Sequence, residues 1–248
     1  MKSVIALAAL TAFVSATSSA SAVHAGDDVV PVAIYRGPAA CDDCPEALAR
    51  AITRVSPRYR VTFVGPNERQ DISDASLRHF KIYVQPGGGQ DIAAALTQLG
   101  PQRVQAIRRF VTDGGNYLGL CMGAYLADRS NIGLIDDQLD SEVRRPGSSA
   151  TDEDDTAVPV RWGGQVQTLY YQDGPFFPAH ADGRGFRQLA AYRNGDVAAA
   201  HYRAGSGSVV LSGPHPEADA SWFADADLPR SMMPAGAPIK TLLEQFAL

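Results

Sequence analysis

The chain has 248 residues, of which 45% are hydrophobic and 20% charged, and its formal net charge is -5. This composition is typical of a globular protein and excludes disorder as the main state. Acidic and basic residues are interspersed without a Lys/Arg-rich run, so no nucleic-acid partner is expected. The length suits one domain of moderate to large size, or at most two small ones, and allows a full core to be buried.

The first 25 residues have the pattern of a secretory signal peptide. Lys2 precedes an apolar stretch over residues 4–14, and small residues follow up to two possible cleavage points, after Ala22 and after Ala25. An uncleaved membrane anchor is the alternative, but this stretch is shorter than the roughly 20 residues that span a bilayer. We therefore expect residues 26–248 to form a single periplasmic or secreted domain, without membrane insertion after cleavage.

Strands and helices alternate in the first half of the mature chain. Apolar runs predict strands at 29–35, 59–64, 80–84 and 117–120. Helical spacing and favourable proline positions predict helices at 45–55, 91–99 and 101–112. Such alternation indicates an α/β fold with a mostly parallel sheet and helices on both faces.

The second half predicts an added antiparallel β region. A polar stretch at 136–155 comes first, with an acidic run at 152–155 that is typical of a solvated loop. A calcium loop is the alternative, but the ligand spacing of a calcium motif is missing, and no metal site is predicted. Strands are then expected at 157–161, 165–171, 186–192, 197–202 and 208–211, and a closing helix at 238–246. Asn194-Gly195 is typical of a hairpin turn.

The three cysteines divide into a pair and a single thiol. Cys41 and Cys44 are separated by two residues and are the natural disulfide pair in an oxidising compartment, which leaves Cys121 free. A redox-active C-x-x-C near a helix start is the alternative reading of the pair. Two intervening aspartates disfavour thiolates, so we favour a structural disulfide.

Cys121 lies in a G-x-C-x-G sequence that directly follows a predicted strand. Gly119 and Gly123 flank it as the glycines of a nucleophile elbow do, because a sharp strand-to-helix turn crowds both positions. The turn would expose the thiol at the carboxyl edge of the sheet, and a following helix N-terminus would favour the thiolate. The alternative is a buried structural cysteine beside two packing glycines.

Two further segments could complete a thiol-dependent site. His215 follows an apolar strand, Pro216 holds it extended, and Glu217 could orient the imidazole. A rigid surface loop that faces solvent is the alternative. The glycines at 87–89 follow another strand and could offer free N–H groups to an oxyanion, with a further N–H from Met122. A flexible connection is the alternative here.

In this order, the glycine loop, the elbow and His-Pro-Glu resemble the class I glutamine amidotransferase superfamily, which implies a flavodoxin-like fold. Within it, the segments 35–38, 85–89, 119–125 and 170–177 look closest to the branch named for the N-terminal domain of biotin-protein ligases. The resemblance implies that Cys121 is the nucleophile, His215 the base and Glu217 the orienting carboxylate. It also implies an oxyanion hole formed by Gly88 or Gly89 with Met122.

Four residues are expected to bind substrate. Tyr170, Tyr171 and Gly174 belong to an aromatic loop that looks shaped to line a site, although its paired phenylalanines could simply fill the core. Tyr125 stands where glutamine-hydrolysing members of the superfamily usually carry Gln.

The sequence therefore predicts an exported thiol-dependent amidase or hydrolase that works through a thioester, rather than a true glutamine amidotransferase. Its substrate would be a small-molecule or peptide amide, and neither a cofactor nor a synthetase partner is expected. One alternative is a non-catalytic domain that binds a small ligand or partner. Another is a redox protein that uses Cys41 and Cys44.

Overall fold

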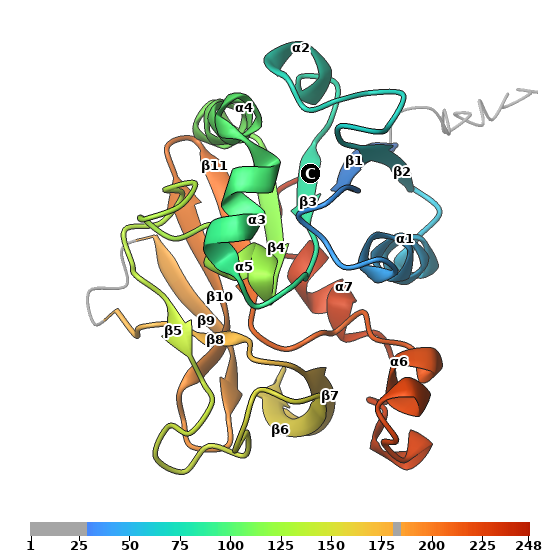
Figure 1. Ribbon diagram of the computed structural model, residues 1–248, viewed down its shortest axis with the longest axis vertical. Helices are drawn as coiled ribbons and strands as arrows, with labels where there is room; N and C mark the ends of the chain where they lie inside the picture. The colour runs from blue at the N-terminus through green and yellow to red at the C-terminus, as the bar shows by residue number, and fades with distance from the viewer. Residues whose placement is uncertain (1–28, 181–184) are drawn as a thin grey trace, which may run out of the picture.

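One mixed sheet of nine strands forms the centre of the protein in the computed structural model, which describes residues 29–180 and 185–248 (Figure 1). From edge to edge the strands are β2 (Tyr59–Val64), β1 (Val30–Tyr35), β3 (Ile82–Gln85), β4 (Asn116–Leu120), β11 (Gly207–Ser212), β10 (Val197–Ala204), β9 (Phe186–Tyr192), β6 (Thr156–Trp162) and β7 (Gln165–Tyr171). The predicted signal peptide, residues 1–25, lies outside the described residues.

The sheet has a parallel half and an antiparallel half that meet at β11. Strands β2, β1, β3, β4 and β11 are parallel neighbours, whereas β11, β10, β9, β6 and β7 are antiparallel neighbours. Tight turns join the antiparallel strands. Gly163 and Gly164 both have positive φ between β6 and β7, and Gly195 has φ 98° in the predicted Asn-Gly hairpin turn. Two short strands, β5 (Asp140–Ser141) and β8 (Pro175–Phe176), pair separately.

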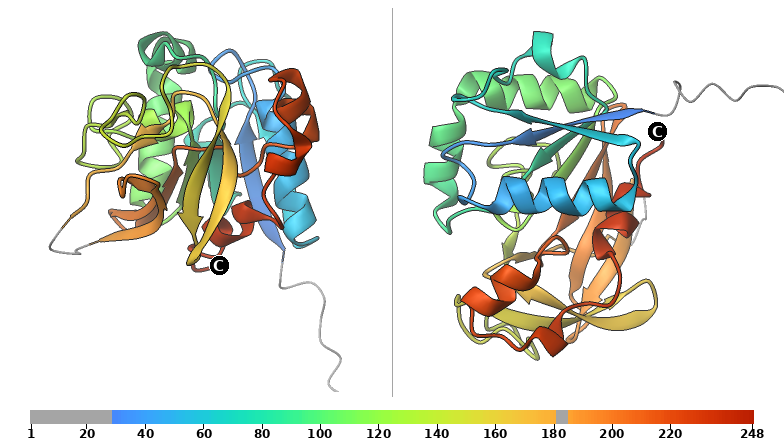
Figure 2. Two further views of the ribbon diagram at one scale, coloured as in Figure 1. Left: turned by 90° about the horizontal axis from the view of Figure 1, so that it is seen from below. Right: turned by 90° about the vertical axis from the view of Figure 1, so that its right-hand side faces the viewer.

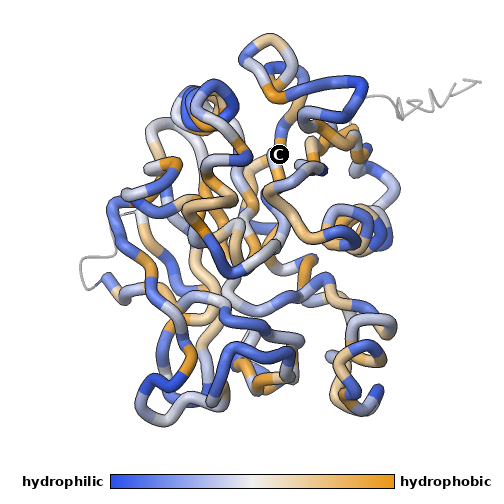
Figure 3. The backbone as a smooth tube through the Cα atoms, viewed as in Figure 1, coloured by the Kyte–Doolittle hydropathy of each residue, from blue (hydrophilic) through white to orange (hydrophobic). Residues whose placement is uncertain are grey.

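Helices cover both faces of the parallel half (Figure 2). On one face lie α1 (Cys44–Val55) and α7 (Pro238–Leu243), and on the other lie α3 (Ile92–Leu99), α4 (Pro101–Thr112) and α5 (Met122–Tyr125). Each face has its own buried core. Leu48 and Leu242 belong to one, and Leu99, Ile107 and Tyr117 to the other. Figure 3 shows the same division, with hydrophobic residues along the inner strands and hydrophilic loops outside. The predicted α/β fold with an added antiparallel region is confirmed.

Three short helices and the burial of one carboxylate in the polar loop were not predicted. The helices are α2 (Asp74–Leu77), α6 (Ala220–Asp225) and the 3-10 helix η1 (Arg230–Met232), too short to show a periodic pattern. Residues 151–155 are exposed as expected. The expectation of a solvated loop is wrong for Glu142, which is 1% exposed and accepts a 2.9 Å hydrogen bond from Asn194. Its burial raises the pKa of this carboxyl to about 7.

No helix within residues 29–180 and 185–248 combines the length and the apolar character that a bilayer-spanning helix needs.

We expect the Gly123→Ala substitution to destabilise the fold strongly. A Cβ atom at Gly123 would collide with the main-chain oxygen of Gln85, which belongs to a central strand and cannot move aside easily. The free energy of unfolding in a denaturant titration should fall by about 3 kcal/mol.

Gly89→Ala is the matched control, because a Cβ atom there meets no heavy atom within 4 Å. The free energy of unfolding of this variant should lie within about 0.5 kcal/mol of the wild-type value. Equal stability of the two variants would contradict the close approach at Gly123.

Candidate active site

Cys121 occupies a sharp turn between β4 and α5, with φ 50° and ψ −113°. A non-glycine residue rarely adopts such a positive φ, and the surroundings must hold it there. The flanking glycines allow this, because a Cβ atom at Gly119 would collide with Gly123 and one at Gly123 would collide with Gln85. Tyr117 also donates a 2.7 Å hydrogen bond to the Gly123 oxygen. These contacts produce the geometry expected of a nucleophile elbow.

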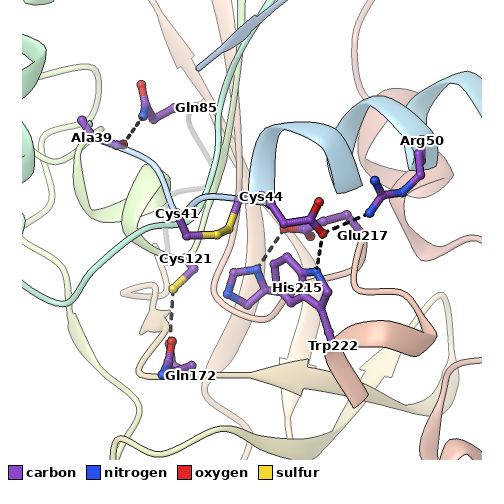
Figure 4. Close-up of a disulfide and its surroundings, with 11 residues drawn as sticks. Ala39, Cys41, Cys44, Arg50, Gln85, Cys121, Gln172, His215, Glu217 and Trp222 are labelled. Atoms are coloured by element: carbon purple, nitrogen blue, oxygen red, sulfur yellow. Dashed lines mark hydrogen bonds and ion pairs between the residues drawn. A yellow bond between two sulfur atoms is a disulfide. The ribbon is translucent and has the colours of Figure 1, made fainter. Parts of the chain in front are cut away.

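The helix after Cys121 is shorter than expected. It contains only the four residues Met122–Tyr125, so the helix dipole at the thiol is weaker than that of a long helix. The Cys121 thiol donates a 3.2 Å hydrogen bond to the main-chain oxygen of Gln172 instead (Figure 4). Cys121 is 6% exposed and therefore has only a narrow opening to solvent.

His215 and Glu217 form a buried pair at the end of β11. The ring Nδ1 of His215 lies 2.9 Å from the Glu217 carboxylate, and the two residues are 5% and 4% exposed. The His215 main-chain N–H donates a 2.9 Å hydrogen bond to the oxygen of Tyr170 on β7. Gly87 leaves room for the ring, because a Cβ atom there would come within 2.7 Å of His215 Cε1. A solvent-facing loop is therefore excluded.

The pKa of His215 responds to both predicted partners. Burial lowers this pKa, but the charges of Glu217 and Cys121 outweigh burial and raise it to about 10. The thiol is therefore close enough to influence the imidazole. Within the described part of the chain, however, the only hydrogen bond of the His215 ring is the one to Glu217. Cys121 and His215 are thus close neighbours, and the hydrogen of the thiol points to the Gln172 oxygen.

The glycine loop and Met122 line a hollow of about 190 Å³ together with Cys121. Among residues 29–180 and 185–248, no acceptor binds the main-chain N–H of Gly88, Gly89 or Met122. These three donors are thus free beside the thiol, as an oxyanion hole requires. The Cys41 N–H donates a 3.1 Å hydrogen bond to the Gly87 oxygen and so fixes the start of the loop.

The four predicted substrate-binding residues divide into two groups. Tyr125 lines the hollow beside Cys121, and Tyr170 lines a second hollow beside His215. Tyr171 is fully buried and donates a 2.8 Å hydrogen bond to the Gly174 oxygen. Gly174 packs against the main chain of Gly213. These last two residues line neither hollow and support the shape of the loop from behind.

Residues that the sequence did not reveal also surround the site. Gln172 accepts the hydrogen bond of the thiol and lines both hollows. Trp222 on α6 lies over the His215 ring, with 5.1 Å between ring centroids. The indole N–H of Trp222 donates a 3.4 Å hydrogen bond to Asp43. No periodic pattern in the sequence indicated that the half-buried Trp222 would lie at the site. A main-chain acceptor such as the Gln172 oxygen has no sequence signature.

The predicted disulfide joins Cys41 and Cys44, and Cys121 is a free, buried cysteine. The two linked residues, with Cα atoms 5.3 Å apart, lie in the wall of the hollow beside His215. Within the part of the chain that the structure describes, no group of three or more His, Cys, Asp or Glu side chains could hold a metal ion.

One thiol per chain should react with an alkylating reagent under denaturing, non-reducing conditions, because only Cys121 is free. Intact mass spectrometry after labelling measures this directly. Reduction before labelling is the control and should raise the number to three. Three reactive thiols without reduction would contradict the disulfide.

Glu217→Gln should lower the pKa of His215 toward its ordinary value, because it removes a negative charge from Nδ1. NMR titration of the imidazole measures the change. The pair stabilises the folded state fully below the unfolded histidine pKa of about 6.5, and this contribution is lost as pH rises through about 10. The difference in free energy of unfolding between the wild type and Glu217→Gln should therefore shrink as pH rises from about 6.5 to about 10. The exposed Glu244→Gln is the control, and an unchanged His215 pKa would refute the pairing.

Comparisons with known proteins agree with this fold. Residues 30–144 match the family described as "Biotin-protein ligase, N terminal". The structure is similar to a crystal structure of a glutamine amidotransferase, with 15% identity, a TM-score of 0.54, and coverage of 79% of this chain and 99% of that one. It is also similar to a putative GMP synthase subunit from Thermoplasma acidophilum, with 14% identity, a TM-score of 0.52, and coverage of 77% and 86%.

The comparison with curated proteins found no match. At these identities the structural neighbours establish the fold alone. The resemblance that the sequence predicted is therefore confirmed: the chain has the fold of a glutamine amidotransferase, and residues 30–144 match the biotin-protein ligase N-terminal family.

Proposed function

We propose that the protein is a thiol-dependent amidase or hydrolase in which Cys121 is the nucleophile. The observation that carries this proposal is the strained backbone of Cys121 beside the buried His215–Glu217 pair. The thiol is close enough to His215 to raise the pKa of the imidazole. Strain of this kind persists only where surrounding contacts hold it, and it is concentrated at functional sites. The amidotransferase fold supports the same class of chemistry.

The first half-reaction would form a thioester. His215 accepts the proton of the Cys121 thiol. The resulting thiolate attacks the carbonyl carbon, and the new C–S bond moves an electron pair onto the carbonyl oxygen. The free N–H groups of Met122 and of Gly88 or Gly89 would stabilise this oxyanion. His215 then gives its proton to the leaving nitrogen as the C–N bond breaks, and Glu217 holds the ring through Nδ1.

The second half-reaction would hydrolyse the thioester. A water molecule enters the space that the amine has left, and His215 accepts its proton as the water oxygen attacks the same carbon. The oxyanion forms again beside the same N–H groups. Collapse of this tetrahedral intermediate breaks the C–S bond and releases a carboxylic acid. The Cys121 thiolate then regains the proton that His215 accepted from water. The thiol must leave its hydrogen bond to the Gln172 oxygen during the cycle.

Location and partners complete the proposal. We propose a periplasmic or secreted enzyme, because the first 25 residues have the pattern of a signal peptide and the cysteine pair suits an oxidising compartment. A small-molecule or peptide amide would be the substrate. An exported hydrolase releases its amine to solvent and needs no synthetase partner.

A second candidate is a non-catalytic binding domain that keeps the same pocket. The hydrogen bond of the Cys121 thiol to Gln172, rather than to His215, favours this candidate. So does Tyr125, whose side chain lines the hollow at the position where glutamine-hydrolysing relatives carry Gln.

Alkylation of native Cys121 separates the two candidates before a substrate is known. If His215 stabilises the thiolate, iodoacetamide should label the wild type at pH 6 at least about tenfold faster than His215→Gln. His201→Gln is the matched control, since this half-buried histidine on β10 lines neither hollow. Equal labelling rates in wild type and His215→Gln would leave only the binding domain.

Cys121→Ala should abolish turnover in a screen of amide, peptide and ester substrates, while leaving the fold intact because the change is small. Circular dichroism and the unfolding midpoint measure the fold. A folded Cys121→Ala variant that keeps full activity would refute the proposed nucleophile.

A further inference from the structure

Two hollows meet at the Cys121–His215 centre. The first, of about 190 Å³, contains Cys121 and the free N–H donors, and the second, of about 260 Å³, contains His215. Gly88 and Gln172 line both and form the boundary between them. The thiol and the imidazole therefore face different compartments of one cleft.

In the proposed reaction His215 donates a proton to the leaving nitrogen, and this step determines which part of the substrate each hollow binds. The carbonyl carbon and its oxyanion must lie beside the thiol and the N–H donors, in the first hollow. The departing nitrogen must lie beside the imidazole, because His215 is the only proton donor proposed for it. His215 is 5% exposed, and Glu217 occupies its Nδ1 atom, which leaves Nε2 to face the thiol and the hollow. It is thus available to a group that enters the second hollow.

The walls of the second hollow are aromatic. The Tyr170 ring meets the His215 ring edge-on at 5.9 Å and the Trp222 ring at 5.2 Å. Cys41 and Cys44 also line this hollow, and Figure 4 shows their disulfide near the His215 ring. Aromatic faces of this kind attract organic cations as well as apolar groups.

Apart from the His215 imidazole, the charged side chains that line this hollow are all acidic. Asp43, Asp155 and Asp225 line it, and no Lys or Arg does. Asp43 is compensated by Arg50 at 3.1 Å. Among the described residues, neither Asp155 nor Asp225 has an ion-pair partner. The uncompensated negative charge therefore comes from these two carboxylates, next to the aromatic wall.

We propose that the second hollow binds the leaving amine of the substrate and selects amines that carry a further positive charge. This inference rests on the proposed amidase function, since that function places the amine beside His215. The substrate class would be amides of diamines or of basic amino compounds, in which the cationic tail lies between Trp222, Asp155 and Asp225. An anionic tail would be disfavoured by the same carboxylates.

Binding is tested first, on the folded Cys121→Ala variant, so that turnover plays no part. The probes are 1,5-diaminopentane, 5-amino-1-pentanol and 6-aminohexanoate, three amines whose tails are positive, neutral and negative. Trp222 reports binding through its fluorescence, because the only other tryptophan, Trp162, is 2% exposed and lies at the opposite end of the β6–β7 hairpin from Tyr170. We expect saturable binding in the order diamine, amino alcohol, amino acid, with about a twofold to fivefold step for each carboxylate involved.

Two variants locate the charge effect. Asp155→Asn combined with Asp225→Asn should remove most of the preference for the diamine. Asp154→Asn, which removes one negative charge from the exposed residue beside Asp155 that does not line the hollow, should retain this preference. Equal affinities for the three probes, no saturable binding, or an unchanged preference in the double variant would each overturn the proposal.

Turnover then separates this proposal from the proposed function. Amides with one acyl group and the same three leaving amines should differ in kcat/KM in the order of binding. Hydrolysis without any dependence on the tail would retain the amidase and refute the amine site. Selective binding without hydrolysis would retain the amine site and refute the amidase.

Discussion

The rest of the site depends on the close approach of three main-chain segments around Cys121. The oxygen of Gln85 on β3 lies against Gly123, and the oxygen of Gly123 lies against Gly119. Side chains at either glycine would force the segments apart, and the turn that holds Cys121 at φ 50° would open. Packing between two neighbouring parallel strands therefore determines where the sulfur lies.

The position of β11 brings the second half of the site to the first. Because β11 is parallel to β4, its carboxyl end lies at the same edge of the sheet as Cys121, and His215 follows it by three residues. Beyond β11 the strand direction alternates through β10, β9, β6 and β7, so the carboxyl end of β7 lies at this edge with Tyr170, and Gln172 directly follows the strand. Residues from both the parallel and the antiparallel half of the sheet therefore surround the thiol.

The strands and the chemical groups could be predicted because they have local signatures. β2 and β7 have the predicted bounds, since a turn glycine directly follows β2 and two turn glycines directly precede β7. The elbow was identifiable because the glycine spacing reflects a steric requirement. Features that depend on tertiary contacts could not be predicted, among them burial of Glu142 in a polar stretch and the main-chain acceptor at Gln172. Tyr171 and Gly174 were expected in the pocket, but the sequence could not show which side of the loop faces inward.

The disulfide makes the shape of the cleft depend on the compartment in which the protein folds. Cross-linking Cys41 to Cys44 closes so short a loop that it restricts the unfolded chain by only about 2 kcal/mol, against about 3 kcal/mol for a 15-residue loop. Its main effect is therefore local, on the wall beside His215 and on the Gly87 contact of Cys41. In a reducing compartment the chain would keep its sheet and its core but lose a fixed boundary of the cleft. Assembly of the cleft is thus coupled to the redox state of the surroundings, and the newly made chain would reach its finished form only after thiol oxidation.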